Sequence, residues 1–115
     1  MESKDRREEG RVESAKQIGL EDAKIKLDQS SAVFVDIRDP GSYSEAHIAG
    51  AIHLDDESIE GFMAEADKNR EHVIYCYHGN SSQGATEFFS EKGFTNVRSL
   101  IGGFEAWRVS FPTES

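Results

Sequence analysis

The sequence is short of cysteine and of positive charge, and it has no long apolar run. Only one of its 115 residues is cysteine. A single cysteine cannot form an internal disulfide, so folding does not require an oxidising compartment. No stretch approaches the roughly 20 apolar residues of a membrane-spanning helix, and residues 1–11 are charged and lack the apolar core of a signal peptide. We therefore expect a soluble, cytoplasmic protein.

The chain carries 13 basic and 22 acidic residues, which gives a net charge of −9. Residues 1–16 contain five charges of each sign, so the acidic excess lies entirely in residues 17–115. Because an acidic body repels phosphate backbones and anionic lipids, we expect neither nucleic acid nor a membrane as a partner. Residues 1–16 have almost no apolar content, which predicts a flexible extension. One domain over 17–112 and a short tail over 113–115 are expected to follow.

From residue 17 onward, helix-like and strand-like patterns alternate. Apolar residues at helical spacing predict helices over 20–27, 42–46, 59–66, 83–92 and 104–111. Apolar or β-branched runs predict strands over 32–37, 49–54, 73–75 and 97–100. In the helix over 83–92, we expect Ala85, Phe88 and Phe89 to form the apolar face. The alternation predicts an α/β domain with a central, mostly parallel sheet and helices on both faces.

The only cysteine, Cys76, stands between a predicted strand and a predicted helix. Between Cys76 and that helix lies a loop of small and polar residues, which are Tyr77, His78, Gly79, Asn80, Ser81 and Ser82. Parallel α/β folds bind ligands beyond the carboxyl ends of their strands. A helix N-terminus offers free backbone N–H groups that stabilise a thiolate or a bound anion. We interpret Cys76 as a nucleophile, and the alternative is a small buried core residue.

Other polar residues near the predicted strand ends have structural interpretations. Asp36 and Arg38 lie two residues apart and therefore on the same side of a strand, where we expect an ion pair or backbone hydrogen bonds that hold the loop near the site. His47 and His53 have no further ligand at a metal-binding spacing, so we predict no metal site.

Within the loop itself, His78 has two possible roles and two serines are candidates for a helix cap. His78 is either a part-time cation beside an anionic ligand or a solvated side chain. Ser81 or Ser82 is well suited to cap the helix that follows.

Three ordered stretches resemble the single-domain rhodaneses, the thiosulfate sulfurtransferases, and among them the small GlpE type. They are VDIRDP at 35–40 leading to AHIAGA at 46–51, CYHGNSS at 76–82, and LIGGFEAW at 100–107. The resemblance covers roughly residues 17–112. The family usually has glycine where this chain has Ala46, a difference that touches no catalytic position.

This resemblance implies a two-step sulfur transfer through Cys76. The thiolate would attack the outer sulfur of thiosulfate, release sulfite and hold the sulfur as a persulfide until cyanide or a thiol such as thioredoxin removes it. Inward-pointing N–H groups from Tyr77 to Ser82 would stabilise both sulfur species, and Gly102 and Gly103 would border the cleft. No cofactor is implied. Because the loop has no Arg or Lys, we expect weak attraction for thiosulfate and the use of another sulfur donor or a protein thiol in the cell.

Two other classes of protein share features of this loop. Cysteine phosphatases and arsenate reductases place an arginine six residues after the cysteine to clamp the anion, and that position is Ser82 here, which disfavours both activities. A non-catalytic rhodanese-like module that binds a partner or senses oxidants would be expected to lack the cysteine or to have a second, resolving thiol. This chain retains Cys76 and has no second cysteine.

Overall fold

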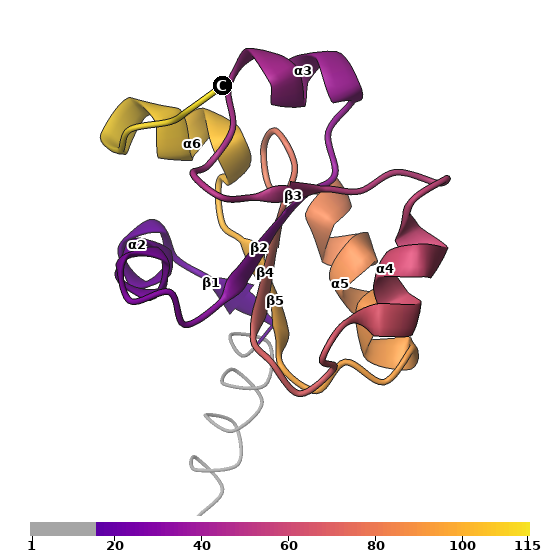
Figure 1. Cartoon of the computed structure of the whole chain (residues 1–115). Coiled ribbons are helices and arrows are strands. Elements are labelled where there is room, and N and C mark those ends of the chain that lie inside the picture. Colours follow the sequence, from indigo (N-terminus) through magenta and orange to yellow (C-terminus); the bar gives the residue numbers. More distant parts are fainter. Residues whose placement is uncertain (1–15) are drawn as a thin grey trace, which may run out of the picture.

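The computed structural model describes residues 16–115, so the extension predicted over 1–16 lies outside the described residues except for Lys16. The elements are β1 (Gln17–Ile18), α2 (Leu20–Asp28), β2 (Val33–Asp36), α3 (Pro40–Glu45), β3 (Ile52–His53), α4 (Ile59–Glu65), β4 (His72–Tyr75), α5 (Ser81–Glu91), β5 (Val97–Leu100) and α6 (Gly103–Ser110). The five strands form one sheet in the order β1-β5-β4-β2-β3. Every neighbouring pair is parallel (Figure 1).

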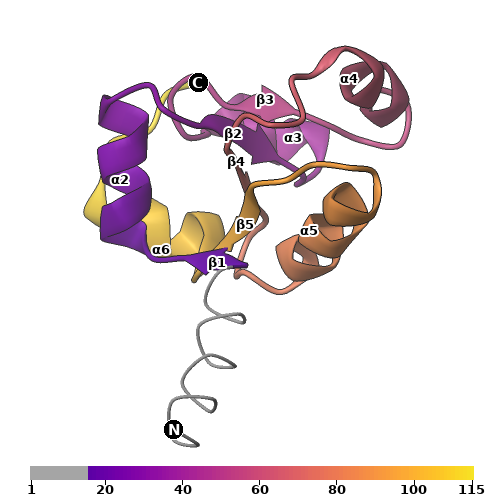
Figure 2. The same ribbon diagram turned by 90° about the horizontal axis from the view of Figure 1, so that it is seen from below.

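Helices cover both faces of this sheet, as the alternating pattern predicted. Viewed along the sheet, α2 and α6 lie on one side and α4 and α5 lie on the other (Figure 2). The short helix α3 lies over one end of the strands instead of on a face (Figure 1). The predicted α/β class and parallel sheet are therefore confirmed. None of the helices within residues 16–115 is long and apolar enough to cross a bilayer.

Strand alternation divides the core into two clusters, one on each face of the sheet. On β4, Val73 and Tyr75 belong to the cluster that includes Trp107 of α6, whereas Ile74 belongs to the cluster that includes Phe89 of α5. Successive strand residues point to opposite faces, so a strand covered on both sides is buried throughout. All four residues of β4 are buried. The end of β4 therefore carries Cys76 out of the rigid centre of the sheet.

The C-terminal tail is attached to the domain by backbone hydrogen bonds. Glu114 exchanges two of them with His47, at 2.8 and 2.9 Å, in an isolated antiparallel bridge. The Glu114 carboxylate also accepts a 2.9 Å hydrogen bond from the N–H of Gly50. The tail thus covers the segment that connects α3 to β3.

Two local expectations were wrong, and one strand was not anticipated. The strand β1 was not predicted, because two residues are too few to show a periodic pattern, and it forms only by pairing with β5. Ser81 and Ser82 do not cap α5 but are its first two residues, and the N-cap is Asn80, without a side-chain cap bond. Phe88 is 41% exposed, because the buried face of α5 runs through Ser82, Thr86 and Phe89 instead.

The two adjacent phenylalanines of α5 should respond differently to truncation. Phe89 is fully buried and its ring centroid lies 4.8 Å from that of Phe94. We expect Phe89→Ala to lower the free energy of unfolding by about 3–5 kcal/mol, and Phe88→Ala to lower it by less than about 1 kcal/mol. Urea unfolding monitored by circular dichroism measures both values. Equal losses in the two variants would contradict the orientation of α5.

Candidate active site

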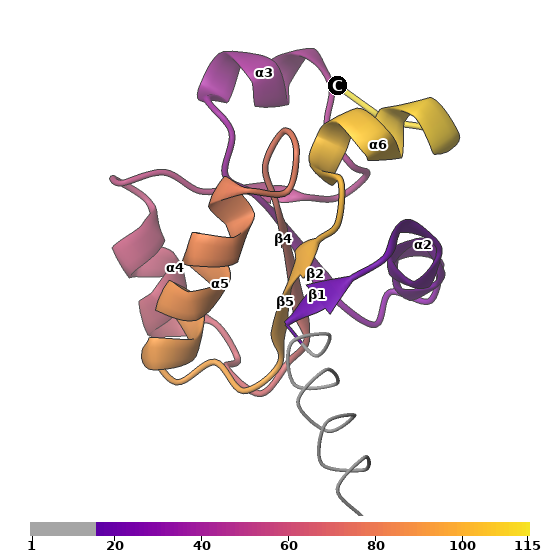
Figure 3. The same ribbon diagram turned by 180° about the vertical axis from the view of Figure 1, so that it is seen from behind.

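The Cys76 loop lies where the connections of the sheet change direction. From β2 the chain runs outward to β3, and from β4 it runs outward to β5 on the opposite side. Such a switch point leaves a crevice at the carboxyl ends of the two central strands. The loop leaves β4 at that end and lies beneath α3 (Figure 3). A cavity of about 450 Å³ opens there, lined by Ile37, Arg38, Asp39, Cys76, Tyr77, His78, Asn80 and Ser81.

Hydrogen-bond donors converge on the sulfur of Cys76. The backbone N–H of Gly79 lies 3.2 Å from Sγ and that of Ser82 lies 3.3 Å from it, and both donate to it. The Ser82 hydroxyl lies 3.4 Å from the same atom. Gly79 has φ +93°, a left-handed conformation that glycine adopts without strain and that curls the loop around the sulfur. Cys76 is only 7% exposed, but it lines the cavity and is not sealed in the core.

These contacts decide the ionisation of the thiol. Burial acts first and raises the pKa of Cys76, because it removes the charged form from water. The Ser82 hydroxyl and the N–H groups of Ser82, Gly79 and His78 act in the opposite direction and outweigh burial, so the pKa lies below that of an ordinary thiol. The thiol of Cys76 therefore ionises more readily than an ordinary thiol, although it is largely buried.

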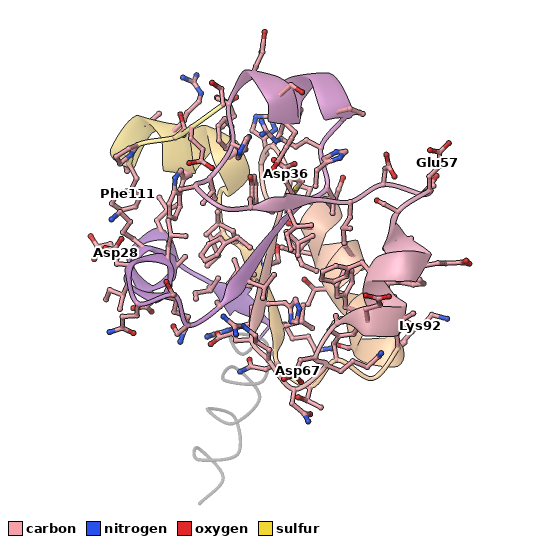
Figure 4. All side chains as sticks on the ribbon, in the orientation of Figure 1. Asp28, Asp36, Glu57, Asp67, Lys92 and Phe111 are labelled. Carbon is pink, nitrogen blue, oxygen red and sulfur yellow. The ribbon has the colours of Figure 1, made fainter. Side chains whose placement is uncertain are left out.

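Asp36 and Arg38 form the buried ion pair that their spacing predicted. Arg38 Nη2 lies 2.7 Å from Asp36 Oδ2 and 2.6 Å from the carbonyl oxygen of Ala46. Asp36 is fully buried beneath α3, unlike the labelled surface residues such as Lys92 (Figure 4). Burial acts to lower the pKa of Arg38, but the neighbouring Asp36 carboxylate raises it overall.

The ion pair also changes the expected electrostatics of the site. Although the loop itself contains no cation, the fold brings Arg38 into the lining of the cavity, with its guanidinium almost completely buried. It lies 4.0 Å from the centroid of the Phe104 ring and 5.3 Å from that of Tyr77. Its charge is compensated by Asp36 at hydrogen-bond distance. A bound anion would therefore meet a donor-rich wall and not a free positive charge.

Gly102 and Gly103 lie behind the loop and support it. The N–H of Phe104 donates to the carbonyl of Cys76 at 2.8 Å, and the N–H of Glu105 donates to that of Tyr77 at 3.0 Å. Gly103 has φ +64°, and a Cβ atom on it would lie 2.7 Å from the Cys76 carbonyl oxygen and closer still to the Tyr77 carbonyl. The start of α6 thus binds the back of the loop while the loop's own N–H groups turn toward the sulfur.

The remaining loop side chains form the rim of the cavity. The Tyr77 hydroxyl contacts the hydroxyl of Ser42 on α3, and Tyr77 is 39% exposed. His78 is exposed and also lines the cavity, so its role beside a bound anion or in solvent stays a prediction. Sequence reasoning missed Ser42 as a neighbour of the loop. The Asp39-Pro40 pair signals only a helix start there, and the Asp39 carboxylate accepts a hydrogen bond from the N–H of Ser42.

The two histidines that were considered as metal ligands bind backbone carbonyl groups. His47 Nδ1 lies 2.7 Å from the carbonyl oxygen of Tyr43, and its ring stacks on the Tyr43 ring. His53 Nε2 lies 2.6 Å from the carbonyl oxygen of Arg38. Within residues 16–115, no three His, Cys, Asp or Glu side chains gather in a group able to hold a metal ion.

Comparison with known proteins gives a consistent result over most of the chain. Residues 19–110 match the family described as Rhodanese-like domain. The chain is 47% identical to the thiosulfate sulfurtransferase GlpE of Pseudomonas entomophila over 100 residues, which is 87% of this chain and 91% of that protein. It is 48% identical to the protein of the same name from Ectopseudomonas mendocina over 90 residues, 78% of this chain and 83% of the relative.

Solved structures show the same fold. A crystal structure of a Bacillus halodurans protein superposes with a TM-score of 0.84 at 25% identity, covering 98% of this chain and 86% of that one. The solution structure of a rhodanese-like domain from Anabaena superposes with a TM-score of 0.78 at 26% identity, covering 87% of this chain and 79% of that one.

Because Gly103 lies so close to the loop, we predict that a side chain at this position disturbs it. Gly103→Ala places a methyl group against two carbonyls at a positive φ, so we expect it to lower the free energy of unfolding by about 2–4 kcal/mol and to displace the N–H groups from the sulfur. Gly84→Ala is the matched control, because Gly84 lies within α5 and a Cβ there meets nothing within 4 Å. Urea unfolding and the rate of Cys76 alkylation measure the two effects. Identical behaviour of both variants would contradict the support role.

Proposed function

Because the chain belongs to the family of rhodanese-like domains, we propose that it is a thiosulfate sulfurtransferase with Cys76 as its nucleophile. The observation that carries the proposal is the convergence of the Gly79 and Ser82 N–H groups on a sulfur atom that borders a cavity. Donors fixed in this way stabilise an anionic sulfur without reorganisation. We assign the catalytic domain to residues 17–112.

In the first step, the Cys76 thiolate attacks the outer sulfur of thiosulfate. A new S–S bond forms to Sγ, the S–S bond of thiosulfate breaks, and its electron pair leaves with sulfite. The enzyme then holds a persulfide whose outer sulfur carries the negative charge. Covalent storage of the transferred group implies ping-pong kinetics. The N–H groups that face Sγ stabilise the attacking thiolate, and the cavity beyond it has room for the outer sulfur.

In the second step, an acceptor takes the outer sulfur and restores the thiolate. Cyanide attacks that sulfur and leaves as thiocyanate, and a thiolate acceptor would leave as its own persulfide. Because Cys76 is the only cysteine, no second thiol of the chain can resolve the persulfide. The acceptor therefore comes from outside, and a small thiol or a thiol protein such as thioredoxin fits this requirement in the cytoplasm.

Phosphoryl or arsenate chemistry has less support at this site. The loop residue six positions after Cys76 is Ser82, whose buried hydroxyl faces the sulfur instead of presenting a guanidinium to an oxyanion. Arg38 borders the cavity but is bound to Asp36 and to the carbonyl of Ala46. Without a free guanidinium, the transition-state charge of a transferred phosphoryl group lacks its main stabilising partner.

The persulfide can be detected directly by mass. Incubation with thiosulfate should add the mass of one sulfur atom to the protein, and cyanide should remove it, with sulfite released in the first step. Cys76→Ser should abolish both the mass gain and sulfite release. Intact-mass spectrometry and a sulfite assay measure these outcomes. Absence of the mass gain would disprove the persulfide, and equal sulfite release by the wild type and Cys76→Ser would favour a partner-binding module.

Thiosulfate should bind weakly to this site. The chain has a net charge of −9, and Asp36 compensates the cation at the cavity wall, so a dianion is repelled at long range. We expect a Michaelis constant above about 1 mM, the upper end of the usual range, which falls as added salt screens the repulsion. Steady-state kinetics between about 0.01 and 0.15 M ionic strength test this. A low, salt-insensitive Michaelis constant would contradict it.

A further inference from the structure

Beneath the reactive loop, a buried serine on β5 contacts the serine that faces the sulfur. Ser99 is 1% exposed and Ser82 is 0% exposed. Their hydroxyl oxygens lie 2.6 Å apart, and the Ser82 hydroxyl lies 3.4 Å from Cys76 Sγ. The three groups therefore form a continuous chain from β5 through the start of α5 to the end of β4. The sulfur-transfer chemistry described above makes no use of Ser99.

The number of protons available sets the direction of the hydrogen bonds between Ser99, Ser82 and Cys76. A serine hydroxyl has one proton to donate and two lone pairs that accept. When Cys76 is a thiolate, its sulfur can only accept, so the single Ser82 proton must point at it. The 2.6 Å contact between the two hydroxyl oxygens then requires the Ser99 proton. A hydroxyl that accepts one hydrogen bond donates a stronger one, because each bond polarises the next.

We propose that Ser99 is a positioning residue, whose hydroxyl donates to Ser82 and thereby directs the Ser82 proton at the Cys76 sulfur. When the sulfur carries a proton, both hydroxyls rotate and the chain runs in the opposite direction, with the thiol donating to Ser82 and Ser82 donating to Ser99. No heavy atom has to move. The inference rests on the proposed role of Cys76 as the reactive group, and it adds a residue from a strand that lies outside the cavity lining.

Other groups near the sulfur do not replace this function. Thr86, one turn further along α5, donates its hydroxyl to the Ser82 carbonyl at 2.8 Å and leaves the Ser82 hydroxyl free. The charged and titratable side chains that line the cavity are Arg38, Asp39, Cys76, Tyr77 and His78. They lie on the open side of the loop, whereas Ser99 reaches the sulfur through Ser82. A substitution at Ser99 therefore leaves Arg38, Asp39, Tyr77 and His78 in place, and Cys76 is the one cavity group whose hydrogen-bond environment it changes.

The pH dependence of Cys76 alkylation by iodoacetamide tests the proposal without requiring sulfur transfer. Only the thiolate reacts, so the wild-type rate should rise with pH through a midpoint below about 8.5, the value of a free thiol. We expect Ser99→Ala to move this midpoint upward by about half a pH unit, the range of one neutral hydrogen bond, which lowers the rate about threefold at pH values well below the midpoint. Ser99→Thr retains the hydroxyl and should keep the wild-type midpoint.

Two further variants separate positioning from simple destabilisation. Thr86→Val removes a buried hydroxyl of the same helix, so it should lower the melting temperature and leave the midpoint unchanged. In a Ser82→Ala background, adding Ser99→Ala should cause no further shift, because Ser99 acts only through Ser82.

The proposal is overturned if Ser99→Ala keeps the wild-type midpoint, if its shift persists in the Ser82→Ala background, or if folded Ser99→Thr behaves like Ser99→Ala. Because alkylation needs only a reactive thiol, these outcomes stand apart from any failure to form a persulfide.

Discussion

The site depends on N–H dipoles that converge on one sulfur atom almost wholly removed from water. Burial alone would keep the thiol protonated, so the N–H groups of Gly79 and Ser82 must be held at 3.2 and 3.3 Å from Sγ. The loop can curl in this way because its two ends are fixed, one by the fully buried strand β4 and the other by helix α5. Helix α6 holds the curl from behind through the carbonyl of Cys76.

Stabilisation by dipoles suits the proposed chemistry better than stabilisation by a cation. The thiolate and the persulfide both carry a single negative charge, so a neutral set of donors serves both states of the catalytic cycle. Sulfite is a doubly charged product, and a free cation in the cavity would retain it. Among residues 16–115, Arg38 is the one arginine that lines the cavity, and its buried guanidinium is bound to the buried carboxylate of Asp36. It contributes rigidity to the loop after β2 while adding little net charge.

Local patterns predicted most of the architecture, and the exceptions have physical reasons. Periodicity identified the longer helices and strands, because amphipathic segments and apolar β-branched runs are strong signals. The alternation of these elements then indicated a parallel sheet. The strand β1 was not predicted because two residues are too few to show a periodic pattern. Phe88 was assigned to the core because it is apolar, but the 100° turn per residue leaves it beside Phe89 and facing solvent. Ser82 looked like a helix cap because capping is the common use of serine there, yet its hydroxyl contacts the sulfur of Cys76 and the hydroxyl of Ser99.

By itself, the sequence determined that there is a single thiol with no resolving partner, that it stands between a buried strand and a helix start, and that the surrounding chain is acidic. These properties are local or compositional, so they need no coordinates. Tertiary structure decided which distant groups meet that thiol. The order of strands puts β2 and β5 on either side of β4, which brings Arg38 to the cavity wall, Gly103 behind the loop and Ser99 beneath Ser82. Such contacts depend on strand order, and local periodicity does not encode strand order because the same segments could form several parallel arrangements.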